Sequence, residues 1–468
     1  MQSYDLAITG AGIAGLNALF VAAQYLPKGA KVALIDRRDR PGGMWTEAYD
    51  YVRLHQPHAI FTAGDLKWQP PHPPSYLARG DEVQGHLASC LARLRGHFEL
   101  TEYFGRTVTA CEEAGDGARL VLDGGEVIGA ARAIHASGFD VHPVAPLSLS
   151  SGAVVSTTPE RLSAEDDPAR PVYVVGGGKT GMDTIQRLAG QGREIRLING
   201  KGTLFLNRTM LFPEGPARWL KAPLQMTAIR DCAIRYDGTN EDEAFDYFRR
   251  TYTISATGGG EQFLLGILSE DECAAIRDAM TEVLPGYLDD VIDGPDGPVM
   301  RMRDGTEHPV ASGSVFVNCT GHLLKTPGEA RPLLSGNGAV LSITPRASVH
   351  FLSSLSSYFA SHLFFLGTLA ETPLWVFDAP AMMAKGRKAF YLALLNHGFL
   401  NTMILADALP LKALNQCGLD PDRWFPLPRR LAAVAHVTWH KKRYKARCAR
   451  TLTTVRDRFG IACAPHRG

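Results

Sequence analysis

The distribution of apolar and polar residues divides the chain into short apolar runs and longer segments with helical composition. Leu6–Ile8 is a short apolar run, and Leu16–Tyr25 follows it as a predicted buried helix. A second apolar run, Lys31–Ile35, ends at Asp36. Short apolar runs that alternate with helices are typical of a parallel sheet. The N-terminal segment therefore predicts a strand, a helix and a second strand.

The same order of elements recurs in the middle of the chain. Val172–Val175 is an apolar run, a helix follows it, and Arg193–Ile198 predicts a strand that ends at Asn199. The remaining pattern predicts further strands around Arg106–Cys111 and Ala118–Leu122 and at Ala133–Phe139, Val315–Gly321 and His362–Gly367. It predicts helices at Glu243–Tyr252 and Glu270–Leu284, and a helical region after Trp375. A loop and then a helix are predicted for Ser75–Arg93, with Leu87, Leu91 and Leu94 in the core.

Both predicted strand-to-helix turns carry a glycine pattern. In the first turn, Gly10 permits a tight bend, Gly12 lets the backbone approach a pyrophosphate, and Gly15 lets the helix pack on the sheet. Asp36 lies about twenty residues beyond the last glycine, where a carboxylate accepts hydrogen bonds from ribose hydroxyls. The dipole of the helix favours phosphate at its N-terminus. The pattern predicts a dinucleotide site at Gly10, Gly12, Ala14, Gly15, Asp36 and Arg37.

The second turn indicates a nicotinamide dinucleotide. The strand after this turn ends at Asn199, where an acid would bind the 2′-hydroxyl of NADH and repel the 2′-phosphate of NADPH. Lys201 and Arg208 follow nearby, and together with the missing acid they favour NADPH. The spacing does not fit a Walker-type phosphate loop. The predicted contacts are Gly176, Gly178, Lys179, Thr180, Gly181, Asn199 and Lys201.

Length and charge narrow the class of protein. The 468 residues allow two or three domains, and a formal net charge of +1 gives no general attraction to nucleic acid. The first strand is predicted to start near residue 4, which leaves no room for a signal peptide, and we expect no apolar run to span a bilayer. The eight cysteines show no CxxC spacing. We therefore expect no metal site and no local redox dithiol, and a cytoplasmic location.

After Asp36 the chain continues to a Gly-Gly-x-Trp segment, formed by Gly42, Gly43 and Trp45. At these residues the chain resembles the class B flavoprotein monooxygenases, which include flavin-containing, Baeyer–Villiger and N-hydroxylating enzymes. The resemblance covers most of residues 4–368. It implies that the first loop holds FAD, that the second holds NADPH, and that the Gly-Gly-x-Trp segment runs along the FAD.

The resemblance also implies roles for residues outside the two loops. The segment after Tyr51 would pass the flavin ring, with Gln56 or His55 as the polar catalytic side chain near it. A histidine can be neutral or charged near pH 7, so His55 is a candidate proton donor. Either residue could equally be a polar loop residue without a catalytic role. The further implied cofactor contacts are Gly43, Met44, Trp45, Val108, Ser137, Gly138, Thr320, Gly321, Gly367 and Thr368.

One family motif is degenerate in this chain. The family carries FxGxxxH in the linker between the nucleotide units, and here Gly152 matches while Ser150 and Ser156 replace the aromatic residue and the histidine. This departure keeps a flavin reductase or dehydrogenase without oxygen insertion open as an alternative. A non-catalytic Rossmann-type binding protein is a further alternative. The motifs leave amines, sulfides and carbonyls equally open as substrates.

The predicted fold is α/β, with two Rossmann-like dinucleotide-binding domains and the NADPH domain inserted in a discontinuous FAD domain. Residues 1–168 form the first FAD segment, residues 169–321 the NAD(P)H domain, and residues 322–468 the second FAD segment with a helical C-terminus. The basic region Arg429–Arg458 predicts a solvated helix face, with contact to an acidic partner, a carrier protein or a membrane surface as the alternative. The predicted function is an FAD-dependent, NADPH-oxidising monooxygenase that acts through a flavin hydroperoxide on a small organic substrate with molecular oxygen.

Overall fold

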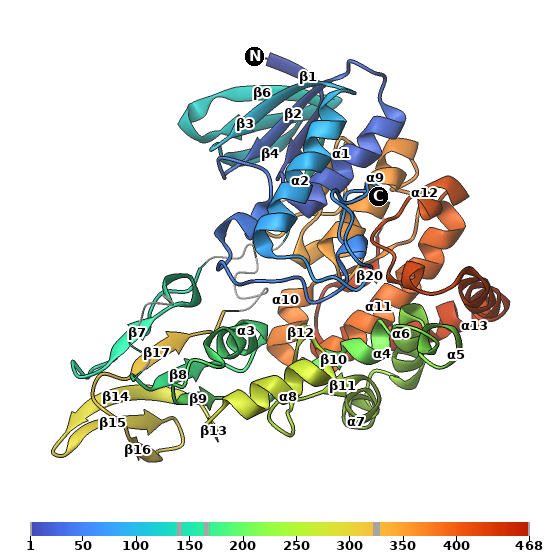
Figure 1. The fold of residues 1–468 in the computed structure, drawn as a ribbon. Helices are drawn as coiled ribbons and strands as arrows, with labels where there is room; N and C mark the ends of the chain where they lie inside the picture. The colour runs from blue at the N-terminus through green and yellow to red at the C-terminus, as the bar shows by residue number, and fades with distance from the viewer. Residues whose placement is uncertain are drawn as a thin grey trace.

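A computed structural model of the chain describes residues 2–136, 138, 143–162, 167, 169–321 and 328–466. Figure 1 shows three parts: a sheet formed mainly by the N-terminal segment, a second sheet from the middle of the chain, and a helical part that covers one side. The first two parts are the predicted Rossmann-like domains. The third part was not predicted as a unit.

The first sheet has seven strands, in the order β3-β2-β1-β6-β5-β4, with β18 beside β6. Ala133 in β6 pairs in parallel with Ala7 in β1 and with Val340 in β18, so a strand from beyond the second domain completes this sheet. The predicted discontinuous domain is therefore observed. The strands are β1 (Gln2–Thr9), β2 (Lys31–Asp36), β3 (Glu99–Phe104), β4 (Val108–Ala114), β5 (Gly117–Leu122), β6 (Val127–His135) and β18 (Val340–Ser342).

Helices α1 (Ile13–Tyr25), α2 (Gly80–Arg95) and α9 (Ser353–Leu366) share a buried core with the first sheet. Two contacts show that α9 runs parallel to α1. Ser357 Oγ donates to Ala14 O at 2.7 Å near the start of α1, and His362 Nδ1 lies 2.8 Å from Tyr25 OH at the end of α1. The prediction of a strand at His362–Gly367 is wrong. This apolar run is the last part of α9, a helix buried on nearly all sides, which lacks the polar face that would mark it as helical.

The second sheet has five parallel strands in the order β13-β9-β8-β17-β7. Helices α3 (Lys179–Leu188) and α8 (Glu270–Ala279) lie against it, so the helix predicted for Glu270–Leu284 ends early and Glu282–Leu284 forms a strand. The strands are β7 (Val155–Thr157), β8 (Val172–Val175), β9 (Ile195–Ile198), β13 (Glu282–Leu284) and β17 (Val315–Asn318). Since β7 pairs with β17, this domain begins before the predicted boundary at residue 168.

Smaller sheets extend the second domain and the C-terminus. One sheet, β14 (Leu288–Gly294), β15 (Gly297–Met302) and β16 (Glu307–Pro309), packs on the second domain through Val291 and Met300. The other strands are β10 (Thr203–Asn207), β11 (Thr253–Ile254), β12 (Gln262–Leu268), β19 (Trp375–Phe377) and β20 (Cys463–Pro465).

The helical part combines residues 208–252 with residues 379–459, which the predicted boundaries assigned to two different domains. Its apolar faces belong to the same continuous core as α1 and α9. Its helices are α4 (Arg208–Leu211), α5 (Ala217–Leu220), α6 (Gln225–Arg235), α7 (Glu241–Tyr252), α10 (Ala379–Lys385), α11 (Arg387–Ala408), α12 (Leu411–Asn415) and α13 (Leu427–Phe459).

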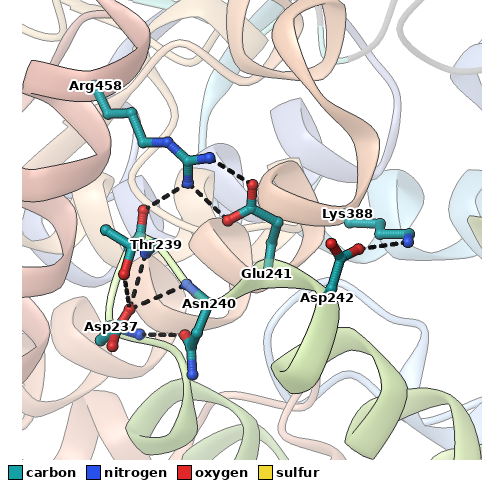
Figure 2. A network of polar contacts seen from close by, with 8 residues as sticks. Asp237, Thr239, Asn240, Glu241, Asp242, Lys388 and Arg458 are labelled. Carbon is teal, nitrogen blue, oxygen red and sulfur yellow. Dashed lines mark hydrogen bonds and ion pairs between the residues drawn. The ribbon is translucent and has the colours of Figure 1, made fainter.

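A polar network ties the loop before α7 to the two long helices (Figure 2). Arg458 in α13 donates to both carboxylate oxygens of Glu241, at 2.6 and 2.7 Å, and Lys388 in α11 pairs with Asp242 at 2.7 Å. Asp237 accepts hydrogen bonds from Thr239 and Asn240 in the same loop. These contacts fix residues 237–242 against the C-terminal helices.

Helix α11 is long and apolar enough to cross a membrane by length and composition, contrary to our expectation that no run would reach that length. However, 83% of its apolar window is buried inside the protein. It packs against α6, α10 and α13 as the central helix of the helical part.

Candidate dinucleotide-binding sites

The first glycine loop has the close contacts that the sequence predicted. Gly10 has a φ of +102°, and a Cβ on Gly15 would lie 1.7 Å from the carbonyl oxygen of Gly10. A Cβ on Gly12 would lie 3.2 Å from the Cα of Gly43. The N-terminus of α1 has no side-chain cap, so its first N–H groups face the loop without a protein side chain to satisfy them. Ala14 lies in this first turn.

Asp36 ends β2 beside the loop. Its carboxylate is buried and accepts hydrogen bonds from Ala11 N at 2.6 Å and Arg38 N at 2.9 Å. Arg37 is exposed next to it. The Nε atom of Arg38 is buried and has no hydrogen-bond partner among the described residues. A polar ligand at this strand end would find a donor in Arg38, which the sequence analysis did not single out.

The Gly-Gly-x-Trp segment forms a short 3-10 helix, Gly43–Glu47, against this loop. Gly42 N donates to Ala11 O, Trp45 packs edge-to-face on Phe61 at 5.6 Å, and Met44 is exposed. The segment therefore lies beside the glycine loop, where the resemblance placed it.

The start of α9 lies at the same edge of the first sheet. A Cβ on Gly138 would lie 3.8 Å from Ser353 Oγ, and α9 has no side-chain cap at its N-terminus. Ser137, the other implied contact at this turn, lies outside the described residues. Sequence reasoning missed Ser353, whose signal was the serine-rich stretch that precedes the apolar run.

Gly367 and Thr368 are not at this edge. Gly367 is the left-handed C-cap of α9, and α9 is parallel to α1, so these residues lie at the end remote from the glycine loop. The structure therefore contradicts their predicted contact with the flavin. The error follows directly from taking the end of a helix for a strand.

The second loop repeats the geometry of the first. Gly176 has a φ of +110° and packs on Cys319, because a Cβ there would lie 2.8 Å from Cys319 O. A Cβ on Gly181 would lie 2.1 Å from Gly176 O. Helix α3 begins after Gly178 without a side-chain cap, and Thr180 lies in its first turn. The free N–H groups of this N-terminus could bind a second anionic group, such as a phosphate.

Asn199 lies at the end of β9 directly beside the second loop. Its Nδ2 donates to Thr257 Oγ1 at 2.9 Å, while its buried Oδ1 has no partner within the described part of the chain. Lys201 follows in the same turn; its side chain is 64% exposed and lies 3.8 Å from Glu261.

Arg208 does not join Lys201. The two residues flank β10 at opposite ends, which places them about 20 Å apart at the usual rise per residue of a strand. Arg208 pairs with Glu272 and donates to His55 O at 3.2 Å. Its predicted contribution to NADPH preference is therefore corrected: only Lys201 lies at the end of β9.

Two tyrosines join the FAD-type segment to α3 of the second domain. Tyr49 donates to Asp183 Oδ2 at 2.8 Å, and the same carboxylate pairs with Lys179. Tyr51 OH lies 3.0 Å from Thr184 Oγ1. Lys179 is thus held at the junction of the two domains, and the two glycine loops are fixed relative to each other.

His55 and Gln56 lie at this junction. Burial, together with the positive charges of Lys179 and Arg208, lowers the pKa of His55 to about 3. Of the two states that the sequence left open, the imidazole is therefore the neutral one near pH 7, and the catalytic role of His55 stays a prediction. Gln56 has a buried Oε1 without a hydrogen-bond partner among the described residues. It remains the better candidate for contact with a ligand.

Three implied contacts stay predictions. Val108 begins β4, after a turn in which Arg106 N donates to Asp36 O, so it lies near the first site. Thr320 donates to Asn318 Oδ1 at the end of β17, and a Cβ on Gly321 would lie 3.0 Å from Val144 Cγ1. Both residues lie where the chain leaves the second sheet.

The degenerate linker belongs to the second domain. Ser150 donates to both carboxylate oxygens of Asp290, and Ser156 Oγ accepts from Leu147 N at 2.7 Å. The serines that replace the family's aromatic residue and histidine are therefore occupied with structural hydrogen bonds.

The cysteines carry no disulfide: all eight are unpaired, and burial raises the pKa of Cys319 to about 12. Within the described residues, His, Cys, Asp and Glu form no group that could hold a metal ion.

Six buried or half-buried histidines predict sensitivity to acid. Burial lowers each pKa to about 3 or about 4, whereas an unfolded histidine has a pKa near 6.5. The unfolded state therefore binds more protons below about pH 6.5, and stability falls as the pH drops towards 4. Burial beside Asp420 raises the pKa of Asp422 to about 7 and acts in the opposite direction, but a single carboxyl offsets about one histidine. The histidines are His55, His86, His135, His350, His362 and His397.

We expect the melting temperature, followed by circular dichroism, to change little between about pH 8 and pH 7 and to fall by several degrees at about pH 5.5. A melting temperature that is the same at about pH 7 and at about pH 5.5 would contradict the neutral state assigned to these histidines.

The amino-acid sequence is similar to those of one known protein family and of several curated proteins. Residues 4–218 match the family described as pyridine nucleotide-disulphide oxidoreductase. An uncharacterized protein of Mycobacterium tuberculosis is 26% identical over 350 residues, which cover 68% of this chain and 60% of that protein. An indole-3-pyruvate monooxygenase of Oryza sativa subsp. japonica is 29% identical over 198 residues, which cover 41% of this chain and 46% of the plant protein.

Solved structures extend the likeness to the whole fold. The closed crystal structure of cyclohexanone monooxygenase superimposes with a TM-score of 0.53 at 15% identity, covering 87% of this chain and 98% of that chain. A mutant flavin monooxygenase from Stenotrophomonas maltophilia gives a TM-score of 0.50 at 17% identity, covering 79% and 99%.

The fold and the two glycine loops thus define a protein with two Rossmann-like domains, of which residues 4–218 resemble an oxidoreductase family. That fold is similar to the folds of cyclohexanone monooxygenase and of a flavin monooxygenase, as the resemblance stated from the motifs implied. The chain spans 60% of the length of the first curated relatives that it matches.

Proposed function

We propose that the protein is an FAD-dependent, NADPH-oxidising monooxygenase that acts on a small organic substrate. The observation that carries the proposal is the pair of uncapped helix N-termini, α1 and α3, each behind a tight glycine loop and joined across the domains by Tyr49 and Tyr51. Two dinucleotides bound at these loops would meet near Gln56. The relatives named as monooxygenases support the same reaction class.

The residues present fit FAD at the first loop. Gly12 lets the Gly-Gly-x-Trp segment approach the loop closely, the first N–H groups of α1 carry no side-chain cap and would meet a pyrophosphate, and Asp36 would accept hydrogen bonds from the ribose. Gly138 and the uncapped start of α9 lie at the same edge. When bound, FAD supplies the redox chemistry, accepting electrons from the nicotinamide and passing them to oxygen.

The second loop fits NADPH. Gly178 and the N-terminus of α3 would hold the pyrophosphate, while Asn199 offers an unpartnered amide oxygen at the strand end. Lys201 is the cation in reach of a 2′-phosphate. Lys179 is already paired within α3 with Asp183, the carboxylate that Tyr49 of the FAD-type segment also contacts, so its contribution to the site would be positive charge at the start of α3.

The residues between the loops would orient and enclose the reacting groups. The neutral imidazole of His55 adds no charge, and Arg208 holds its backbone carbonyl. The unpartnered Gln56 Oε1 would accept a hydrogen bond from the ligand. Buried amides of this kind align a ligand without taking part in proton transfer.

The decisive experiment is incorporation of ¹⁸O₂ during NADPH oxidation, with a panel of amines, sulfides and ketones. One labelled oxygen atom in a product, formed in proportion to NADPH consumed, supports the monooxygenase. NADPH oxidation that passes electrons to artificial acceptors, with no label in any product, supports the reductase alternative. The degenerate linker at Ser150 and Ser156 is the observation that favours this alternative. A colourless protein that takes up no FAD would indicate the non-catalytic binding protein.

Lys201→Glu is expected to raise the KM for NADPH by roughly tenfold or more and to leave that for NADH within about threefold, because a carboxylate repels the 2′-phosphate. Steady-state kinetics with both cofactors measures this difference. Lys28→Glu, at an exposed lysine of the first domain, is the matched control. An unchanged preference would remove Lys201 from the proposed site.

Molecular oxygen and one small molecule are the proposed co-substrates. We keep the cytoplasm as the proposed location, in line with eight unpaired cysteines.

A further inference from the structure

The N-terminal half of α13 exposes an apolar row that the predicted solvated basic face did not include. Leu427, Leu431 and Val434 recur at intervals of three and four residues and therefore share one side of the helix. All three are exposed, Leu431 at 59%, and Trp439 nearby is 86% exposed. The opposite side of the helix packs on the protein through Ala433 and Tyr444. Exposed aliphatic side chains in a row, with an exposed tryptophan further along the same helix, mark an interaction surface.

The charged residues of α13 up to residue 456 are all basic. Residues 427–456 contain nine lysines and arginines and no acidic residue, although the whole chain has a net charge of only +1. Lys442 lies eight residues, or about two turns, beyond Val434 and is exposed, as is Arg443 beside it. No ion pair within the described residues involves either side chain, whereas Lys441 and Lys445 on the protein-facing side both pair with Asp407.

A second exposed apolar element lies beside the first turn of α13. Helix α5 exposes Trp219 at 58% and Leu220 at 76%, and it is fixed there because Arg429 donates to the carbonyl oxygens of Arg218 and Ala222. Figure 1 shows α13 and α5 together at the outer edge of the helical part, away from both nucleotide-type sheets.

We propose that this surface, formed by the apolar row of α13 with α5, docks the protein onto an anionic lipid surface. Leucines, valine and tryptophan that enter the headgroup region, next to lysines and arginines that meet anionic headgroups, are the features of a helix lying in a membrane interface. A second copy of the chain fits less well. It would bring two acid-free cationic helices together, and like charges oppose such pairing.

The test is flotation of the full-length protein with vesicles of mixed phosphatidylglycerol and phosphatidylcholine, compared with pure phosphatidylcholine. The wild type is expected to float with the anionic vesicles at low salt and to be released at high salt. Leu431→Glu combined with Val434→Glu is expected to weaken vesicle binding by about tenfold or more, because it places two carboxylates in the apolar row.

A charge variant tests the other half of the surface. Lys442→Glu with Arg443→Glu leaves the aliphatic row intact and is expected to lose the preference for anionic vesicles. Val155→Glu, at an exposed valine on the second domain's edge strand, is the matched control and is expected to bind like the wild type. Circular dichroism of each variant checks that it folds.

Three results would overturn the proposal. The first is a wild type that does not float with anionic vesicles, and the second is flotation that Leu431→Glu with Val434→Glu leaves unchanged. The third is a dimer, seen by sedimentation, that the same double variant dissociates while vesicles are ignored; this result would assign the surface to a second copy. None of these outcomes depends on whether the protein is a monooxygenase.

Discussion

The Gly12→Val variant is expected to fold and to lose its FAD. The backbone of Gly12, with φ −84° and ψ −171°, is extended and open to any residue, so valine adds no backbone strain. The first added atom would already lie 3.2 Å from the Cα of Gly43. The two branches of valine would therefore crowd the backbone of Gly43 and displace the glycine loop and the Gly-Gly-x-Trp segment, between which the pyrophosphate is proposed to lie.

The expected size of the effect is a loss of FAD affinity of roughly a hundredfold or more, because the pyrophosphate loses both its space and its access to the N-terminus of α1. The measurement is flavin absorbance per mole of purified protein, with FAD titration of the apoprotein. Gly85→Val is the matched control, because a Cβ at Gly85 on α2 meets no atom within 4 Å. Full flavin content in Gly12→Val would refute the assignment of the first loop.

The two loops could be predicted because their chemistry is local. A glycine is required wherever a Cβ would collide, as at Gly15 and Gly181, and this requirement is written directly into the sequence. The acid that ends β2 is fixed by the length of α1 and its connection. Local constraints of this kind survive in a single sequence without any knowledge of distant contacts.

The errors arose where distant segments decide the result. The last turns of α9 are buried on nearly all sides, and an apolar run of that length has no period that separates a helix from a buried strand. His55 was predicted to be neutral or charged near pH 7, but Lys179 of the second domain and Arg208 of the helical part help to lower its pKa. Such effects depend on how the domains are arranged.

The sequence also could not predict that residues 208–252 pack with the C-terminal helices in one helical part. Each segment is amphipathic or apolar by itself, and the sequence does not state which apolar face meets which. The structure pairs α6 and α7 with α11 in the core that also holds α1. That shared core connects the helical part to the first site, and one residue of α11 makes the connection testable.

Asn401→Leu is expected to be the most destabilising substitution in α11. Asn401 is fully buried, and its amide accepts from Trp375 N at 2.9 Å and donates to Val349 O at 2.7 Å and Trp375 O at 2.8 Å. Leucine has a similar volume but can replace none of these bonds. A buried backbone group left without its partner costs about 1 to 3 kcal/mol, so the total is expected to be about 3 to 5 kcal/mol.

Asn396→Leu on the same helix is the matched control. Asn396 is equally buried, but within the described residues its amide donates one hydrogen bond, to Ala233 O, and its Oδ1 has no partner. Removing that amide also removes an unpaired buried acceptor, so its net cost is expected to be about 1 kcal/mol. The melting temperature of Asn401→Leu should fall several degrees below that of Asn396→Leu.

The same comparison links the helical part to the cofactor. Val349 belongs to the segment that leads into α9, and the uncapped start of α9 lies beside Gly138 at the edge of the first sheet. Because Asn401 holds this segment in place, Asn401→Leu is expected to retain less FAD than Asn396→Leu at a temperature where both are folded. Equal melting temperatures would show that the bonds of Asn401 contribute little. A lower melting temperature with equal FAD retention would show that α11 stabilises the fold without positioning α9 for the cofactor.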